Sequence, residues 1–150
     1  WCGDPTVSLT VKPVIDLTEH VKVAQYEVPD RLGERTWLRD PACVFPWCTR
    51  PARSACDADH VIPYDHDHPD QGGSTCDCNL APLCRWHHRL KTHYRRWRSK
   101  TIEPGVYLWT SPHGYVFLRD ATGTTDVTPT GLKPVPGCPD HDPADPGPPE

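Results

Sequence analysis

Four residues in two short pairs have the types and spacing of a structural zinc site. Cys43 and Cys48 enclose a tight loop with Pro46 between them. Cys84 and His87 are three residues apart on a predicted helix, and residues at that spacing lie on one face. Zinc in structural sites takes four Cys or His ligands at tetrahedral corners. The two pairs therefore predict one zinc ion held between a loop and the start of a helix.

The cysteine content leaves other interpretations open. The chain has eight Cys, so disulfides are the first alternative, and buried free Cys that pack as small apolar residues are another. If three Cys bind zinc, an odd number remain, which favours a reduced, cytoplasmic protein over complete pairing. Cys56 could replace Cys48 as a ligand, and His88 could replace His87, with poorer geometry. Residues 76–78 (CDC) could form a local redox or metal pair, although a loop detail is the simpler interpretation.

A second polar set, Asp59, His60, Asn79 and His88, is interleaved with the zinc pairs and could hydrolyse a phosphodiester. That reaction needs an activated water, which a His base can supply, and a divalent cation held by carboxylate and imidazole. Asp59 and His60 are adjacent on a predicted strand and so point to opposite faces. His88 is rotated by about 100° from His87 around the helix, so the two can serve different metals. An isolated Asp-His pair would usually be structural. The inference of a hydrolytic site depends on the position of Asp59-His60 between the two zinc pairs.

Positive charge is concentrated in one segment of an acidic chain. The net charge is −4, yet residues 81–100 contain no Asp or Glu. A solvated helix face usually mixes signs, so this run predicts a surface that contacts phosphates without reading bases. Tyr94 and Trp97 are expected to pack against a hairpin rather than stack on bases. The candidate nucleic-acid contacts are Arg85, Arg89, Lys91, Arg95 and Arg96.

These side chains need elements to position them, and the pattern predicts an α+β fold. Pro29 suits a first helical position and Asp40-Pro41 a helix end, whereas Pro82, with Asn79 at or near the cap, suggests a second helix start. The predicted elements are a strand at 7–15, a helix at 29–39, a strand at 59–63, a polar loop at 64–78, a helix at 81–96, and a hairpin of 105–110 and 114–118.

The predicted organisation is one small core with appendages. We expect an N-terminal extension at 1–40, the zinc-stabilised core at 41–100, a β-hairpin at 101–127 and a disordered tail rich in Pro and Asp at 128–150. The chain lacks Met and opens on Trp1, so we expect a fragment of a longer or processed protein. No apolar run approaches the ~18 residues of a membrane span, and no membrane partner is expected.

The motifs C-x4-C, DHVIPY, GGST, NLAPLC and RWHHRLKTH resemble the HNH endonucleases, specifically the actinobacterial type that follows a DUF222 (13E12-repeat) region. The resemblance covers roughly residues 29–125. It implies a treble-clef, ββα-metal fold, with residues 1–40 as the end of a DUF222-like region. It also implies DNA, expected to be double-stranded, as the substrate, and a strand break that leaves 5′-phosphate and 3′-hydroxyl ends.

The resemblance also implies roles for individual residues. Asp59 and His88 are expected to bind a catalytic Mg²⁺ or Mn²⁺, and His60 to be the general base. Asn79 is expected to orient the loop and His60, or to join the metal in some relatives. The zinc positions match Cys43, Cys48, Cys84 and His87. A non-catalytic zinc-dependent DNA-binding module, and a toxin or mobile-element component, are the alternatives.

Two positions depart from the family pattern. The loop 65–71 (DHDHPDQ) is longer and richer in His than usual, and His66 and His68 are expected to be solvated rather than metal-bound. Some relatives add a ligand four residues after the last His, where this chain has Thr92. His93 is one residue too late for the same helix face, so a phosphate contact is the most we expect of it.

Overall fold

The computed structural model describes residues 15–69, 71–94 and 96–130. Most of the predicted strand at 7–15, the phosphate contact Arg95 and the tail beyond residue 130 lie outside the described residues. The elements in chain order are β1 (Lys22–Val23), α1 (Asp30–Arg39), α2 (Ala52–Ala55), β2 (Cys56–His60), β3 (Thr75–Cys76), β4 (Leu80–Cys84), α3 (Arg85–Tyr94), β5 (Arg98–Glu103), β6 (Val106–Thr110), β7 (Val116–Asp120) and β8 (Gly123–Asp126).

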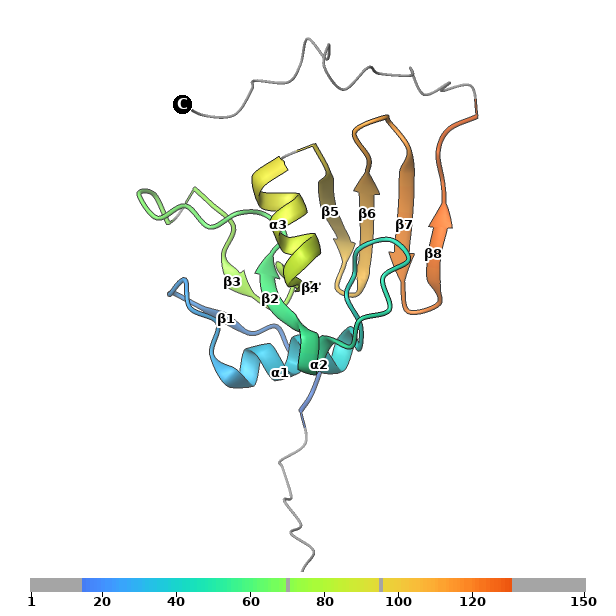
Figure 1. Ribbon diagram of the computed structural model, residues 1–150. Coiled ribbons are helices and arrows are strands. Elements are labelled where there is room, and N and C mark those ends of the chain that lie inside the picture. Colours follow the sequence, from blue (N-terminus) through green and yellow to red (C-terminus); the bar gives the residue numbers. More distant parts are fainter. Residues whose placement is uncertain (1–14, 70, 95, 131–150) are drawn as a thin grey trace, which may run out of the picture.

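The strands form three small antiparallel sheets. β1 pairs with β3, β2 pairs with β4, and β5 to β8 form a four-stranded sheet in chain order. In Figure 1 the four-stranded sheet lies on one side of α3 and the loop between β2 and β3 on the other. The structure is therefore mixed α and β with small sheets, and the predicted class is confirmed at that level.

The first helix agrees with its prediction. α1 spans Asp30–Arg39 with Pro29 as its N-cap and Asp40 as its C-cap. The fixed φ of Pro29 suits the entry to the helix, and Pro41 excludes the helical conformation for Asp40. The helix buries Leu32 against the rest of the domain, where that side chain is 2% exposed.

The predicted helix at 81–96 is wrong in its first turn. Residues 80–84 form strand β4, which pairs with β2 from Cys56↔Cys84 to His60↔Leu80. A short, fully apolar run is compatible with either a helix or a buried strand, and here all five residues are buried. The Pro82 carbonyl accepts a hydrogen bond from Val44 N at 3.0 Å, so that edge of Pro82 faces away from β2. Pro82 therefore removes no hydrogen bond from the β2–β4 pair.

The predicted strand at 59–63 is displaced toward the N-terminus. β2 spans Cys56–His60 and ends at the His, so Asp59 and His60 are its last two residues. Val61 N then donates to Asn79 O at 2.8 Å as the chain leaves the strand pair. The loop that follows extends to Ser74, the residue before β3.

The predicted hairpin is confirmed, but it is half of a larger sheet. β6 and β7 pair with Trp109 opposite Phe117, and Gly114 adopts a φ of +84° in the turn between them. Strands β5 and β8 were not predicted, because RSKTIE and GTTD are mostly polar and give no apolar run. β5 pairs with β6 and β8 with β7, so both edges of the hairpin are covered.

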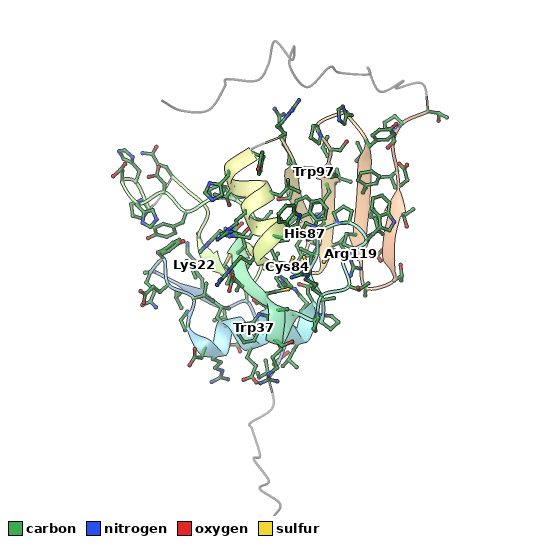
Figure 2. The ribbon with its side chains drawn as sticks, in the orientation of Figure 1. Lys22, Trp37, Cys84, His87, Trp97 and Arg119 are labelled. Carbon is green, nitrogen blue, oxygen red and sulfur yellow. The ribbon has the colours of Figure 1, made fainter. Side chains whose placement is uncertain are left out.

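The hydrophobic core lies where this sheet meets the loop at 43–48, strand β4 and helix α3. Phe45 contacts Trp97 and Trp109 at ring distances of 4.8 and 5.1 Å. Figure 2 shows Trp97 and His87 together between α3 and the four-stranded sheet. Packing by Trp97 was expected and is confirmed. Tyr94 was expected to pack as well, and this is wrong, because its side chain is 66% exposed.

Two arginines of α1 hold the turn between β3 and β4. Arg35, 3% exposed, donates to Asp77 Oδ2 at 3.0 Å. Arg39 donates to the carbonyl of Asp77 and, at 2.6 Å, to that of Leu80. Arg39 thereby satisfies backbone oxygens at both ends of this turn, and Arg35 holds the Asp77 side chain within it. The turn before β4 is therefore fixed by a helix more than thirty residues earlier in the chain.

Candidate metal centre and adjacent polar site

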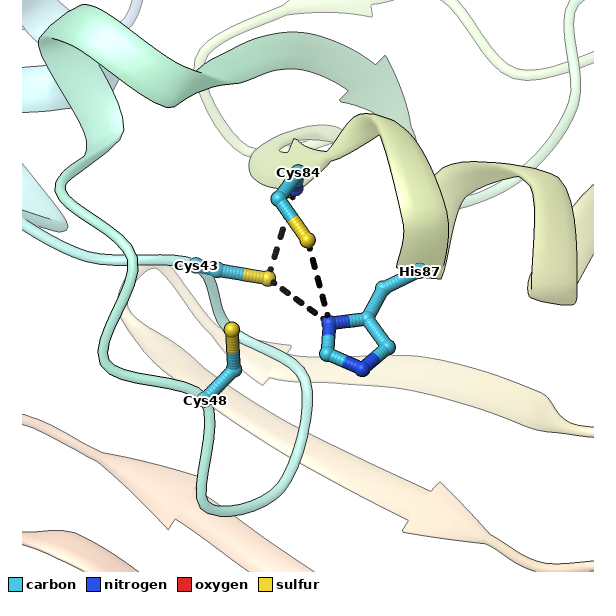
Figure 3. A group of neighbouring side chains, drawn as sticks. All are labelled: Cys43, Cys48, Cys84 and His87. Atoms are coloured by element: carbon cyan, nitrogen blue, oxygen red, sulfur yellow. Dashed lines mark hydrogen bonds between the residues drawn. The ribbon is translucent and has the colours of Figure 1, made fainter.

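The structure brings the four predicted zinc ligands together. The donor atoms of Cys43, Cys48, Cys84 and His87 all lie within 4.8 Å of one another. Figure 3 shows the four side chains converging from the loop and from the junction of β4 and α3. His87 Nδ1 is 3.5 Å from Cys43 Sγ and 3.2 Å from Cys84 Sγ. Tetrahedral zinc with bonds of ~2.0–2.3 Å places its donor atoms ~3.3–3.8 Å apart. The group could hold a metal ion, and its donor set is compatible with zinc.

Backbone hydrogen bonds shape the loop that presents the first pair. Cys43 N donates to Arg50 O at 2.9 Å, and Cys48 N donates to Phe45 O at 3.0 Å. Trp47 takes a φ of 58°, a left-handed conformation that a side chain tolerates only in a tight turn. Both thiols are thereby directed to one point. The second pair straddles the junction of two elements, since Cys84 ends β4 and His87 lies in the first turn of α3.

The protonation states around this group follow from burial. Burial raises the pKa of the Cys43 thiol well above its usual range, since a lone thiolate is costly there. Burial, together with the charge of Arg50, lowers the pKa of His87, so its imidazole is neutral and able to bind a metal. The Phe45 ring stacks on His87 at 3.9 Å and fixes its plane. A bound cation would favour the thiolate forms that burial alone opposes.

The structure does not place Cys56 or His88, the alternative ligands, in the four-residue group. Cys56 is opposite Cys84 in the β2–β4 pair, but its thiol donates weakly to the Arg50 carbonyl at 3.8 Å. Burial raises the pKa of Cys56 to about 11. His88 points to a different partner, as described next. Neither residue belongs to the four-ligand group.

A second polar site is centred on Asp59. Its Oδ1 lies 3.1 Å from His88 Nε2, and its Oδ2 accepts a hydrogen bond from Lys91 Nζ at 2.5 Å. The Asp59 side chain is 11% exposed and that of His88 is 39% exposed. Burial alone would raise the pKa of Asp59, but the hydrogen bonds and charges of His88 and Lys91 outweigh it and lower that pKa. The same hydrogen bond raises the pKa of His88.

His60 faces away from Asp59, as alternation along a strand requires. Its Nε2 lies 2.8 Å from Thr75 Oγ1, and its ring stacks on Tyr26 at 5.4 Å. The residue is 8% exposed. Burial lowers the pKa of His60, so the imidazole is neutral over a wider range below neutral pH. Sequence reasoning missed Thr75 and Tyr26. Thr75 lies within GGST, but that motif by itself indicates no contact with His60.

Asn79 closes the loop between β2 and β3. Its Oδ1 accepts from Ile62 N at 2.8 Å, and its Nδ2 donates to the carbonyls of Ile62 and Ser74 at 3.0 and 2.9 Å. A Cβ at Gly73 would meet Ile62 O at 2.0 Å and Asn79 Nδ2 at 2.5 Å, so only glycine fits there. Asn79 is thus a loop-orienting residue. Its suggested place at a helix cap is wrong, because α3 begins at Arg85.

The basic surface is smaller than the sequence suggested. Arg85 and Arg89 are exposed on α3, next to Trp86, whose side chain is 68% exposed. Lys91 was expected on this surface, but its side chain is 13% exposed and its ammonium donates to Asp59 and to the His60 carbonyl. Arg96 is half-buried. Among the predicted phosphate contacts that the structure describes, Arg85 and Arg89 are therefore the exposed pair.

Among the described residues, the groups of potential metal ligands do not include His66, His68, Thr92 or His93, although His66 lies near His60 through the Tyr26 ring that both contact. His66 packs against Tyr26 at a ring distance of 4.6 Å, and His68 lies 3.7 Å from Asp65 within the loop. Thr92 and His93 are exposed on the last turn of α3.

Comparisons with known proteins give relatives without a described activity. No family model and no solved structure matches the chain. The uncharacterized protein Rv3776 of Mycobacterium tuberculosis (strain ATCC 25618 / H37Rv) is 34% identical over 119 residues, which cover 76% of this chain and 22% of that protein. The uncharacterized proteins MT2160 and Rv2100 of Mycobacterium tuberculosis are each 37% identical over 92 residues, which cover 61% of this chain and 16% of theirs. The chain thus spans about a fifth of the length of these relatives.

Within the residues that the structure describes, no helix is long and apolar enough to cross a membrane.

Proposed function

We propose that this chain is a metal-dependent endonuclease of the HNH type that hydrolyses DNA phosphodiester bonds. The observation that carries the proposal is the Asp59–His88 pair. A carboxylate oxygen and an imidazole nitrogen lie 3.1 Å apart, separate from the Cys/His group, with His60 next in sequence. A divalent ion that cleaves phosphodiesters needs such a pair and open positions for water and phosphate.

The donor set fits a hard divalent ion such as Mg²⁺ or Mn²⁺. Asp59 Oδ1 and His88 Nε2 would hold it, and the ion would stabilise charge on the phosphate and the leaving oxygen. His60 would take the proton of the attacking water. Because Thr75 Oγ1 engages Nε2 of His60, the base role falls to Nδ1. The neutral form that burial favours is the form that a general base requires.

The strands and helix around these residues support a ββα-metal arrangement. β2 and β4 form the antiparallel pair, and α3 follows β4 directly. The loop at 43–48 and the start of α3 supply the zinc ligands, which is the layout of a treble clef. In this proposal zinc is structural, and it fixes the helix that carries His88.

DNA would lie along the exposed side of α3. Arg85 and Arg89 would contact backbone phosphates, which position a duplex without reading its sequence. The exposed Trp86 lies between them in the chain and offers an apolar contact to the sugar or base edge.

A cleavage assay on supercoiled plasmid tests the proposal. The full chain, purified with zinc, should convert supercoiled plasmid to nicked or linear forms with Mg²⁺ or Mn²⁺, and not after these ions are removed. The new ends should carry 5′-phosphate and 3′-hydroxyl groups, as ligation without end repair would reveal. Intact plasmid across all divalent ions, from protein that still binds DNA, would contradict the enzyme.

One observation favours a non-catalytic DNA-binding module as the second candidate. The Lys91 ammonium already lies 2.5 Å from Asp59 Oδ2, so a cation of the protein itself partly neutralises this carboxylate. If that contact persists with divalent ions present, Asp59 is a structural partner of α3. The plasmid assay separates the two candidates, because the module binds DNA without cutting it.

The different environments of two basic residues of α3 predict different salt dependences of DNA binding. Arg89→Ala should weaken binding and make the slope of log K against log salt less steep by ~0.9, the value for one lost phosphate contact. Lys91→Met should leave that slope unchanged, because Lys91 faces Asp59 and not solvent. Fluorescence anisotropy with a labelled duplex at several salt concentrations measures both. Equal slope changes for the two variants would place Lys91 on the DNA surface after all.

A further inference from the structure

Three residues outside both sites bring two thiols and an imidazole together. Cys76 Sγ and Cys78 Sγ are 2.7 Å apart, and His20 Nε2 lies 3.4 Å from Cys78 Sγ. All three donor atoms lie within 4.8 Å of one another. His20 and Cys78 are 58 positions apart in the chain. Tertiary structure, and not local sequence alone, therefore assembles this group.

The backbone around the group holds its two segments in contact. β1 pairs with β3, with Lys22 opposite Cys76, and Asp77 N donates to Val21 O at 3.1 Å. Arg35 bonds to carbonyls of the segment before β1 and also to Asp77 Oδ2. His20 is thus presented to the CDC turn by hydrogen bonds that do not involve the three donor atoms.

The buried carboxylate of Asp77 lies beside the group. Asp77 is 8% exposed, and its Oδ1 accepts no hydrogen bond in the described part of the chain. This oxygen lies 3.7 Å from His20 Nε2. A buried acceptor is normally satisfied, so an orphaned one next to potential ligands points to a bound cation or its water. A small surface cavity lined by His20, Asp77 and Cys78 gives access to it.

We propose that His20, Cys76 and Cys78 bind a second zinc ion, with the Asp77 carboxylate beside it. Thiolate and imidazole are the ligands that zinc takes in proteins, and the two thiols release their protons to solvent when the ion binds. Three protein ligands leave a fourth position for water or the Asp77 oxygen. This inference does not depend on the proposed nuclease activity.

The second ion would connect the segment before β1 to the turn between β3 and β4. Asn79, which closes the loop, lies in that turn, and Thr75, which contacts His60, directly precedes Cys76 in β3. Its expected role is to stabilise the turn, because the ion would add a cross-link to the short β1–β3 pair and the Arg35 contacts that join these two segments.

Zinc content distinguishes this site from the first. The full chain, purified with zinc and a reductant, is compared with Cys78→Ser and His20→Ala by elemental analysis and native mass spectrometry. Each variant should carry one zinc ion fewer per chain than the unaltered protein. Both positions are exposed, so circular dichroism should find the fold retained. His113→Ala, at an exposed His in the turn between β6 and β7, is the matched control and should keep the full zinc content.

Two results would overturn the proposal. One is equal zinc content in the unaltered protein, Cys78→Ser and His20→Ala. The other is a Cys76–Cys78 disulfide in protein handled with reductant and zinc, detected as a mass lower by two hydrogens and a peptide resistant to alkylation. Protection of Cys78 from alkylation by zinc, lost in His20→Ala, would support the ion.

Discussion

Replacing Cys84 with Ser should abolish zinc binding by the group of Cys43, Cys48, Cys84 and His87 and unfold the part of the chain around it. Cys84 is fully buried, and its backbone N–H donates to Cys43 Sγ at 3.4 Å. Binding of structural zinc is worth ~10–16 kcal/mol in small domains, which is as large as the ~5–15 kcal/mol that stabilises a typical domain. We therefore expect that the variant cannot maintain the junction of β4 and α3.

Thermal unfolding and zinc analysis measure this effect. The Cys84→Ser protein should lose its cooperative transition and carry one zinc ion fewer per chain. Cys56→Ser is the matched control, because Cys56 lies opposite Cys84 in the strand pair but outside the four-ligand group. It should keep its zinc and unfold near the temperature of the unaltered chain. A Cys84→Ser protein that keeps its zinc and its transition would show that the four donors are only neighbouring buried side chains.

If the chain is the proposed nuclease, replacing His60 with Ala should reduce the rate of DNA cleavage by ~10²–10⁴-fold, the usual contribution of a general base. The proposed role requires a neutral imidazole held in one orientation. The contact with Thr75 and the stacking on Tyr26 provide the orientation, and burial provides the neutral form. DNA affinity should change little, because His60 is 8% exposed and lies away from Arg85 and Arg89.

Single-turnover cleavage with Mn²⁺ or Mg²⁺ measures the loss, and anisotropy with the same duplex measures affinity. His93→Ala is the matched control, since His93 is an exposed His on α3 and belongs to neither potential metal group. Zinc content and circular dichroism must be the same in both variants. If His60→Ala cuts as fast as the unaltered chain, His60 is not the base, whatever the identity of the metal ligands.

Spacing within the sequence was sufficient to predict which residues meet at the metal centre. The zinc pairs each sit within a few residues, in a loop and at a helix start, so local geometry decides where their donors point. The separation of Asp59 from His60, and of His87 from His88, follows from the periods of strand and helix. The structure places Asp59 beside His88 and His60 on the other face of β2.

The contacts that sequence reasoning missed are tertiary. Tyr26 and Thr75 reach His60 from segments whose positions are set by the β1–β3 pair, and two residues per strand give no periodic signal. Lys91 lies in a basic segment, which predicted a contact with DNA. Its ammonium instead donates a hydrogen bond to the buried carboxylate of Asp59. Residues 80–84 show where the prediction of secondary structure fails, because an apolar run of five residues is compatible with either a strand or a helix.

The strand pair β2–β4 fixes the distance between the metal centre and the polar site around Asp59. It has Cys56↔Cys84 at one end and His60↔Leu80 at the other, so the ladder sets how far the polar site lies from the metal centre. One residue added to β2 would exchange the faces of Asp59 and His60. The loop from Val61 to Ser74 has no such constraint, because Asn79 fastens both of its ends. Insertions and deletions among related chains should therefore gather in this loop and be absent from the strand pair.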